Sequence, residues 1–233
     1  MRARLFAATT LAALIIPTTA YAAPAAPTDE NLRTTNPATS CIRGVNRPLV
    51  NQTSPRLQAF VPAADENDGR SVKVEFRLKN LADGTEVFTS ESFTKVVGVW
   101  FEAGSEPTLA DATTYSWQAR VVDSTGAASP WSAGCELSID TVRPNAPTLT
   151  LSPGPYKVGQ KITLTFGNAG STDVTQYAYA VATSAPGSPI PACPGKVTVK
   201  LTDSGPTPIR AWSYDRAGNL SPTYTEQRIA VAP

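Results

Sequence analysis

Residues 109–147 read LADATTYSWQARVVDSTGAASPWSAGCELSIDTVRPNAP, and the interpretation of the whole chain rests on this stretch. It opens with a run whose alternate residues are apolar: Tyr115, Trp117, Ala119 and Val121. A period of two predicts a half-buried β-strand. A turn signal at residues 123–126, a second strand that carries Cys135 and a proline-rich exit follow. The stretch therefore predicts a hairpin that closes one β-domain and a linker to the next.

The chain before this stretch has the same character. Alternate residues are apolar at Val72, Val74, Phe76 and Leu78, with charged residues between them. Asp83-Gly84 supplies a hairpin signal, and no segment shows a helical period. Short strands separated by turn residues predict an all-β fold of antiparallel sandwich type.

The run from Leu109 through Tyr115 and Trp117, with the turn at 123–126 and the Ser-Pro-Trp-Ser that follows at 129–132, resembles the tyrosine-corner strand and closing hairpin of fibronectin type III domains. It is most similar to such modules in exported Gram-positive bacterial proteins. The resemblance implies that the Tyr115 hydroxyl bonds back onto the loop that begins near Leu109 and that Trp117 is core. We also expect Arg120 to stack on Trp131.

Part of this pattern recurs at a constant offset of 92. Ala211, Asp215, Gly218, Ser221 and Pro222 repeat Ala119, Asp123, Gly126, Ser129 and Pro130. The repeat predicts two tandem β-sandwich domains: a fibronectin type III-like domain at 41–140, a semi-rigid Pro-rich linker at 141–147, and a second domain at 148–233. Thr207 stands where the corner tyrosine should be, so the second domain is left as immunoglobulin-like or fibronectin-like.

The N-terminus reads as a secretory signal. Arg2 and Arg4 precede an apolar run of about a dozen residues, and Ala20-Tyr21-Ala22 is a small-residue cleavage site, so residues 1–22 are predicted to be removed. Such a run is too short for a membrane anchor, which needs roughly 20 residues. We expect a secreted, extracellular protein with no membrane anchor. Residues 23–40 are rich in Ala, Pro and Thr, and we expect a flexible lead-in that packs against nothing.

Composition narrows the function classes. Without the signal, 18 basic residues face 19 acidic ones, so nucleic acid is not an implied partner. The charge is uneven: residues 41–140 carry 9 basic and 13 acidic residues, and residues 141–233 carry 8 and 4. The chain has no histidine, and therefore lacks the usual general base and the commonest transition-metal ligand. We expect no enzyme activity.

Three cysteines allow three pairings. Cys41 and Cys135 bracket the first domain, and export favours a disulfide between them. The chain-entropy model assigns such a long loop about 4–5 kcal/mol. Cys193 is left over, either as a free thiol or for pairing between chains.

Two further kinds of site are left open. Asp65, Asn67 and Asp68 form an incomplete calcium loop, and a polar turn is the favoured interpretation. By fold-level analogy with bacterial adhesin repeats, Asp140 and Asp215 are candidates for calcium at the domain joint. Trp100 and Trp212 are candidates for stacking on a ligand, although core packing is the favoured interpretation because large aromatic side chains are mostly buried.

The sequence thus favours a secreted, non-catalytic pair of β-sandwiches with an adhesion, binding or spacer role toward an unknown protein or polysaccharide partner. One alternative is a carbohydrate-binding accessory protein that uses exposed aromatic side chains. The other is an unrecognised hydrolase or inhibitor.

Overall fold

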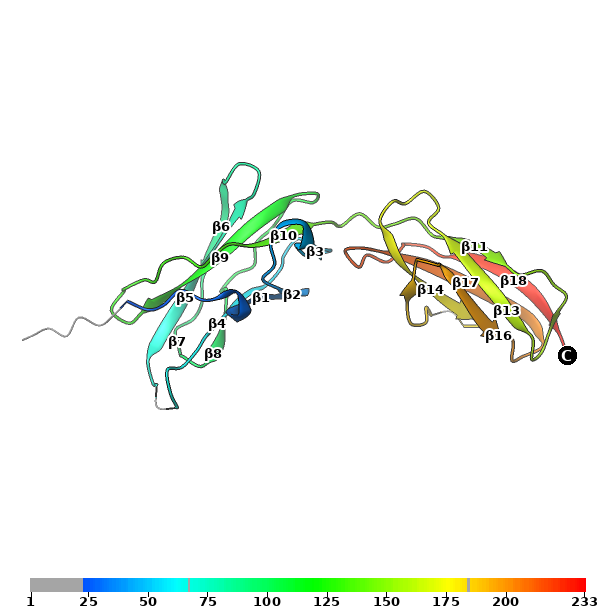
Figure 1. Cartoon of the computed structure of the whole chain (residues 1–233), viewed down its shortest axis with the longest axis horizontal. Coiled ribbons are helices and arrows are strands. Elements are labelled where there is room, and N and C mark those ends of the chain that lie inside the picture. Colours follow the sequence, from blue (N-terminus) through cyan, green and yellow to red (C-terminus); the bar gives the residue numbers. More distant parts are fainter. Residues whose placement is uncertain (1–22, 67, 184) are drawn as a thin grey trace, which may run out of the picture.

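The computed structural model describes residues 23–66, 68–183 and 185–233 and consists of two β-sandwiches placed end to end (Figure 1). The expected signal segment, residues 1–22, and Asn67 of the incomplete calcium loop lie outside the described residues. The all-β prediction is confirmed, because strands make up both modules and the only helices among the described residues are two short 3-10 turns, η1 (Asp29–Asn31) and η2 (Gly44–Asn46).

Two sheets build the first module. One has the order β2-β1-β4-β8 and the other the order β3-β10-β9-β5-β6, with β7 also paired to β5. Their strands are β1 (Leu32–Thr35), β2 (Ala38–Ser40), β3 (Leu49–Val50), β4 (Leu57–Val61), β5 (Ser71–Asn80), β6 (Glu86–Glu91), β7 (Lys95–Val96), β8 (Val99–Glu102), β9 (Thr114–Asp123) and β10 (Cys135–Ile139). Adjacent strands are antiparallel except β3 and β10, which are parallel.

The second module repeats this plan with fewer strands. Its sheets have the orders β11-β13-β16 and β12-β18-β17-β14-β15. The strands are β11 (Thr148–Leu151), β12 (Tyr156–Lys157), β13 (Lys161–Gly167), β14 (Val174–Val181), β15 (Ile190–Pro191), β16 (Lys196–Lys200), β17 (Gly205–Asp215) and β18 (Thr225–Ala232). As in the first module, a short strand, β12, pairs in parallel with the last strand, β18.

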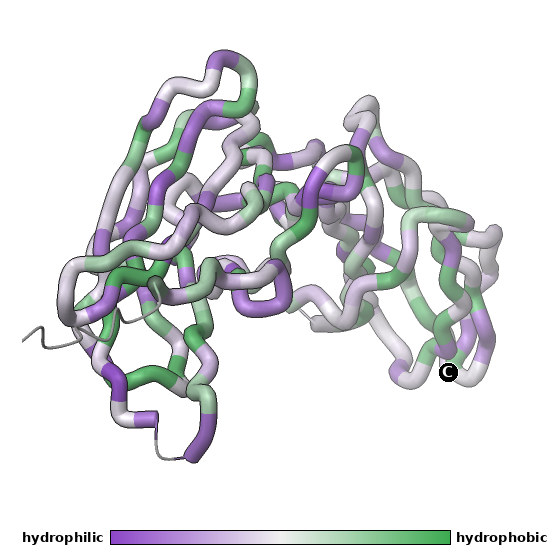
Figure 2. The backbone as a smooth tube through the Cα atoms, turned by 60° about the vertical axis from the view of Figure 1, so that its left-hand side comes forward, coloured by the Kyte–Doolittle hydropathy of each residue, from purple (hydrophilic) through white to green (hydrophobic). Residues whose placement is uncertain are grey.

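Alternation along the strands builds a separate core in each module. On β5, burial alternates in step with the apolar residues, and the charged residues between them face solvent. Hydrophilic and hydrophobic residues accordingly alternate along the chain in Figure 2. Trp117, Phe76 and Phe101 are the largest fully buried side chains of the first core, and Leu164, Ile162 and Ile209 lie at the centre of the second.

The prediction that residues 23–40 form a flexible lead-in is wrong. Residues 32–35 form β1, which pairs antiparallel with β4 and with β2, and Leu32 is 1% exposed in the core of the first module. A strand this short carries only one large apolar residue, so its hydrophobic period is too weak to see in the sequence. Backbone pairing with β4 orders this segment, and the composition of residues 23–40 gives no sign of that pairing.

The closing hairpin has the corner that the sequence resemblance implies. The Ala110 N–H donates to the Tyr115 hydroxyl at 2.9 Å, and Leu109 and Tyr115 are both buried. After the turn, the Ser129 hydroxyl accepts from the Val121 N–H at 3.0 Å. This bond ties the turn's exit back to β9.

The same hairpin recurs 92 residues later. The Ser213 N–H donates to the Ser221 hydroxyl at 3.2 Å, and the bridge Tyr214↔Leu220 repeats Val122↔Ala128. The sequence repeat is therefore a structural repeat. In the position of the corner tyrosine, Thr207 bonds only weakly to the carbonyl of Gly205, at 3.4 Å.

A disulfide joins Cys41 and Cys135, as predicted, with their Cα atoms 4.9 Å apart. It links the chain between β2 and β3 to the first residue of β10, so it closes a span of 94 residues. Cys193 is exposed and free.

Candidate functional site

Trp100 lies on an outer face of the first module, on edge strand β8. It is half-buried, opposite Phe60 of β4, with the two ring centroids 5.5 Å apart. The guanidinium of Arg33 on β1 lies 3.7 Å from the indole centroid. Three neighbouring strands thus build one aromatic and cationic surface, which we call the Trp100 face.

A row of polar groups continues the Trp100 face. The Arg33 Nε donates to the Gln58 Oε1 at 2.8 Å, and the Gln58 Nε2 donates to the Glu102 Oε1 at 3.3 Å. Arg56 pairs with Glu102 and Glu106 beyond it. The register Arg33↔Gln58↔Glu102 across the sheet aligns these groups. An aromatic plane beside fixed donors and acceptors is a chemistry that suits sugar rings.

The sequence could have revealed Phe60, because it alternates outward from Leu57, Ala59 and Val61 on the same strand. It could not have revealed Arg33, because the lead-in that carries it was expected to be unfolded. The structure thus places Phe60 and Arg33 beside Trp100, two neighbours that the sequence prediction did not include.

Trp212, the second predicted stacking residue, is buried at 6% exposure, so the structure contradicts a free stacking role. It lies against Ala178 and Ala180 of β14, and Tyr224 covers it at 5.3 Å between ring centroids. Tyr224 comes from the segment that follows the closing turn. That return of the chain over the outer face of the sheet fills the space that a ligand would need.

Trp117 and Trp131 have structural roles. Trp117 is buried in the core, as expected. Trp131 stacks with Arg120 at 4.6 Å, as predicted, and also with Arg77 at 4.2 Å. Arg120 in turn pairs with Glu75 at 2.7 Å. The guanidinium groups of Arg77 and Arg120 are therefore both held by contacts within the protein.

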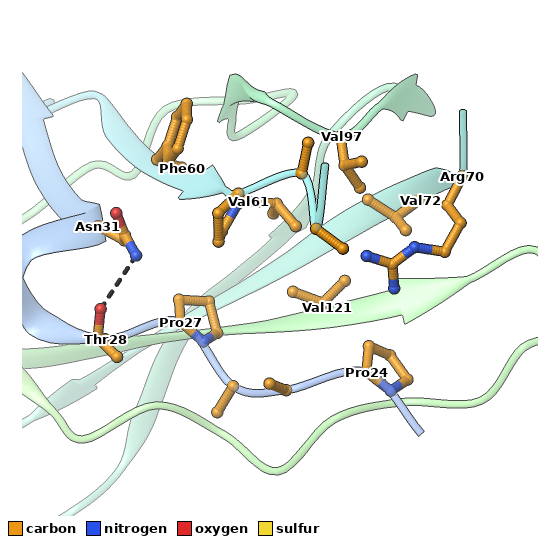
Figure 3. Close-up of a pocket in the computed structure, with 15 residues that line it drawn as sticks. Pro24, Pro27, Thr28, Asn31, Phe60, Val61, Arg70, Val72, Val97 and Val121 are labelled. Atoms are coloured by element: carbon orange, nitrogen blue, oxygen red, sulfur yellow. Dashed lines mark hydrogen bonds between the residues drawn. The ribbon is translucent and has the colours of Figure 1, made fainter. Parts of the chain in front are cut away.

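A pocket of about 310 Å³ lies at the end of the first sandwich, with the segment 24–27 along one side (Figure 3). Its walls are apolar, with Val61, Val72 and Val121 among them. Arg70 at its edge is already paired with Asp68 at 2.6 Å. Thr28 and Asn31 also line it, and the Asn31 Nδ2 donates to the Thr28 hydroxyl at 3.0 Å, so part of the polar capacity of the lining is used within the protein.

The linker between the modules is held by side chains of the second module. The Asn219 Nδ2 donates to the carbonyl of Asp140 at 2.8 Å and to that of Val142 at 3.4 Å. The Ser213 hydroxyl donates to the carbonyl of Asn145 at 2.5 Å. Asn219 is only 7% exposed and Ser213 is fully buried, so these bonds are shielded from water.

Further contacts complete this joint. The Thr225 hydroxyl donates to the carbonyl of Pro147, and the Thr141 N–H donates to Asp111 at 2.7 Å. A Cβ atom at Gly218 would lie 3.8 Å from the Asn51 Nδ2, so the closing turn of the second module lies against a loop of the first. Pro144 and Pro147 are buried. The linker is therefore packed and hydrogen-bonded, beyond the stiffness that its prolines predicted.

Three carboxylates meet beside this joint. Oxygens of Asp140, Asp173 and Asp215 lie within 4.8 Å of one another. Burial raises the pKa of Asp140, and the charges of Asp215 and Asp173 raise it further. Carboxylate oxygens are the ligands that Ca²⁺ prefers, so these residues could hold such an ion. Asp215 also accepts two bonds from Asn219, through which it orients the amide that holds the linker. Sequence reasoning named Asp140 and Asp215 but missed Asp173, which precedes β14 and has no motif around it.

The turn after β4 has a simpler explanation than calcium. Asp68 accepts from the Ala64 N–H at 2.8 Å and pairs with Arg70. The hydrogen bonds from Arg70 and Ala64 hold the pKa of Asp68 far below its usual range. Its oxygens are thus used within the turn, as the favoured interpretation expected.

Comparison with known proteins assigns the fold. The chain is 19% identical to a structure of the fibronectin(III)-like modules of Clostridium thermocellum CbhA, with a TM-score of 0.54 over 86% of this chain and 94% of that one. It is 12% identical to the FN1–FN3 domains of chicken CNTN1, with a TM-score of 0.58 over 90% of this chain and 66% of that one.

The chain has the fibronectin type III-like fold. Because the CbhA alignment spans most of the chain, the likeness covers both fibronectin-like modules. No protein-family model matches the sequence, and no curated protein does. Within the described part of the chain, no helix is long and apolar enough to cross a membrane.

Proposed function

We propose that the chain is a secreted, non-catalytic protein in which two fibronectin-like modules present binding surfaces at a fixed separation, in an adhesion, binding or spacer role. The observation that carries the spacer part is the joint, where Asn219 and Ser213 donate hydrogen bonds to the carbonyl of Asp140, at the end of the first module, and to those of Val142 and Asn145 in the linker. A linker held in this way gives the two modules one relative orientation. The absence of histidine from all 233 residues supports a role without acid–base catalysis.

Export is supported by two independent features. One is the signal-like N-terminus, and the other is the disulfide between Cys41 and Cys135, which persists in an oxidising compartment. Expression of the full chain in a bacterial host tests this part. We expect a polypeptide in the culture fluid whose mass corresponds to cleavage after Ala22. Retention of the uncleaved chain inside the cell would contradict export.

A second candidate function is carbohydrate binding, and the Trp100 face favours it. There Trp100 and Phe60 form a half-exposed aromatic surface beside Arg33, Gln58 and Glu102. Pull-down with insoluble polysaccharides tests it: saturable binding should fall about 5-fold or more on Trp100→Ala, because a lost aromatic contact is worth about 1 kcal/mol or more. Tyr224→Ala is the matched control, since Tyr224 is an aromatic residue with 47% exposure and lies in the second module, away from the Trp100 face. An equal loss in both variants, or no binding by the wild type, would rule this function out.

A further inference from the structure

The outer face of the sheet β11-β13-β16 in the second module is made of threonines and lysines. Alternation puts Ile162 and Leu164 into the core and leaves the residues between them outside. Across β13 and β16 the outward pairs are Lys161↔Lys200, Thr163↔Thr198 and Thr165↔Lys196, and Thr150 of β11 lies opposite Thr165. We call this surface the Lys–Thr face.

The lysines of this face have no counter-charge. Strands β11, β13 and β16 contain no acidic residue, and within the described chain Lys161, Lys196 and Lys200 form no ion pair. Lys161 and Lys200 even stand directly opposite each other, an arrangement of like charges that is destabilising in a sheet. The first module differs, because its outer-face Lys73 and Arg120 pair with Glu91 and Glu75.

The threonines add unused hydrogen-bonding groups. Thr150 and Thr198 are exposed, and Thr163 and Thr165 are partly exposed. Their hydroxyls make no hydrogen bond within the described chain, so each can donate and accept toward a ligand. Lys196 and Lys200 are four residues apart on one strand, which separates the charges by about 13 Å at ~3.3 Å per residue. The surface is thus a strip of cationic groups with hydroxyls between them.

We propose that the Lys–Thr face binds an anionic polysaccharide, a hydroxyl-rich polymer with repeated carboxylate or phosphate groups. Its charges would meet the three lysines, and its hydroxyls would exchange hydrogen bonds with the threonines. The inference deepens the proposed binding role and rests on export, which brings the protein to such polymers. The net positive charge of residues 141–233, with 8 basic and 4 acidic residues, has the sign required for attraction at a distance.

The chemistry of the face disfavours other macromolecules. It has no aromatic side chain on which unpaired bases could stack, and no large apolar side chain that could anchor a protein partner or enter a membrane. What remains is attraction of charge and exchange of hydroxyl hydrogen bonds, both of which a flexible acidic polymer satisfies.

Binding of the mature protein to soluble polymers tests the proposal. The probes are polygalacturonate for carboxylate groups, phosphorylated dextran for phosphate groups, neutral dextran and duplex DNA. We expect binding to one or both acidic hydroxyl-rich polymers, weakened by added salt, and little to dextran or DNA. Equal or tighter binding to duplex DNA, or no binding to either acidic polymer, would overturn the proposal.

The variant Lys161→Gln/Lys196→Gln/Lys200→Gln should weaken polymer binding by about 10-fold or more, since each exposed ionic contact contributes up to about 1 kcal/mol. The control Lys79→Gln/Arg143→Gln/Lys157→Gln removes the same charge elsewhere and should bind like the wild type. Equal losses in the two variants would show attraction by net charge alone and overturn the assignment to this face. Lys161→Arg/Lys196→Arg/Lys200→Arg keeps the charge and should retain binding, which guards against misfolding. Detection of the protein in the culture fluid is scored separately, so a failure of export would count against the proposed function and not against this face.

Discussion

Tyr115 shows how one residue fixes the crossover between the two sheets of the first module. Its hydroxyl accepts the Ala110 N–H at 2.9 Å in a buried setting, and Thr207 cannot reach as far in the second module. Tyr115→Phe keeps the ring and removes the acceptor. We expect a loss of about 1–2 kcal/mol in the free energy of unfolding of the first module, because the Ala110 N–H is left unsatisfied. Urea unfolding measures it, and an unchanged midpoint would contradict the role of the corner.

Glu136 couples the stability of the first module to pH. It accepts the Gly44 N–H at 2.9 Å and the Arg47 Nε at 2.8 Å, beside the disulfide. Burial opposes ionisation of Glu136, but these bonds and the charges of Arg47 and Arg43 outweigh it and lower its pKa. A lowered pKa stabilises the fold above the ordinary value of 4.5, and this contribution is lost as the pH falls through the folded-state pKa.

Glu136→Gln should therefore cost about 1 kcal/mol of unfolding free energy at pH 7, because two hydrogen bonds lose their charged acceptor. The difference between wild type and variant should be smaller at pH 3 than at pH 7, because the charge of Glu136 is lost as the pH falls through its folded-state pKa. Urea unfolding at the two pH values measures this. A difference that is equal at both would show that ionisation of Glu136 does not matter.

Strand β1 is the element that sequence reasoning missed, and its contribution can be measured. Leu32 is 1% exposed in the first core and belongs to a strand of four residues. Leu32→Ala should destabilise the first module by about 2–5 kcal/mol, as for other buried leucines. Ala25→Ser, at an exposed position ahead of the strand, is the control and should change little. Equal, small effects would mean that residues 23–40 are the flexible lead-in after all.

Long strands with strict alternation of apolar and polar residues could be predicted from the sequence, and short strands could not. Strands β5 and β9 run for ten residues each, so their alternation, the corner at Tyr115 and the disulfide partners were visible in the sequence. The four residues of β1 give too few repeats. Burial of Trp212 agrees with the favoured core interpretation, but the sequence could not show that Tyr224, from a segment outside the strand, is the residue that covers it. Asp173 comes close to Asp140 and Asp215 only when the chain folds, so the sequence could not identify it as part of this carboxylate cluster.

The whole molecule depends on the joint. Residues 141–147 leave the first module and enter the second with their carbonyls bound by Asn219, Ser213 and Thr225. Asn219 is oriented by Asp215, and the equivalent turn residue in the first module, 92 positions earlier, is Ala127. The second copy of the hairpin therefore carries an amide that the first copy lacks, at the place where the modules meet. We propose that these hydrogen bonds of Asn219 fix the separation of the two modules.

Electron-spin distance measurement between the modules tests this claim most directly. Spin labels at Val87→Cys and Val158→Cys, both exposed, are placed in a Cys193→Ser background, with one label in each module. We expect one narrow distance distribution, which broadens on Asn219→Ala because the linker carbonyls lose their donor, while both modules stay folded. A broad distribution before the Asn219 substitution, or no change after it, would contradict the fixed joint.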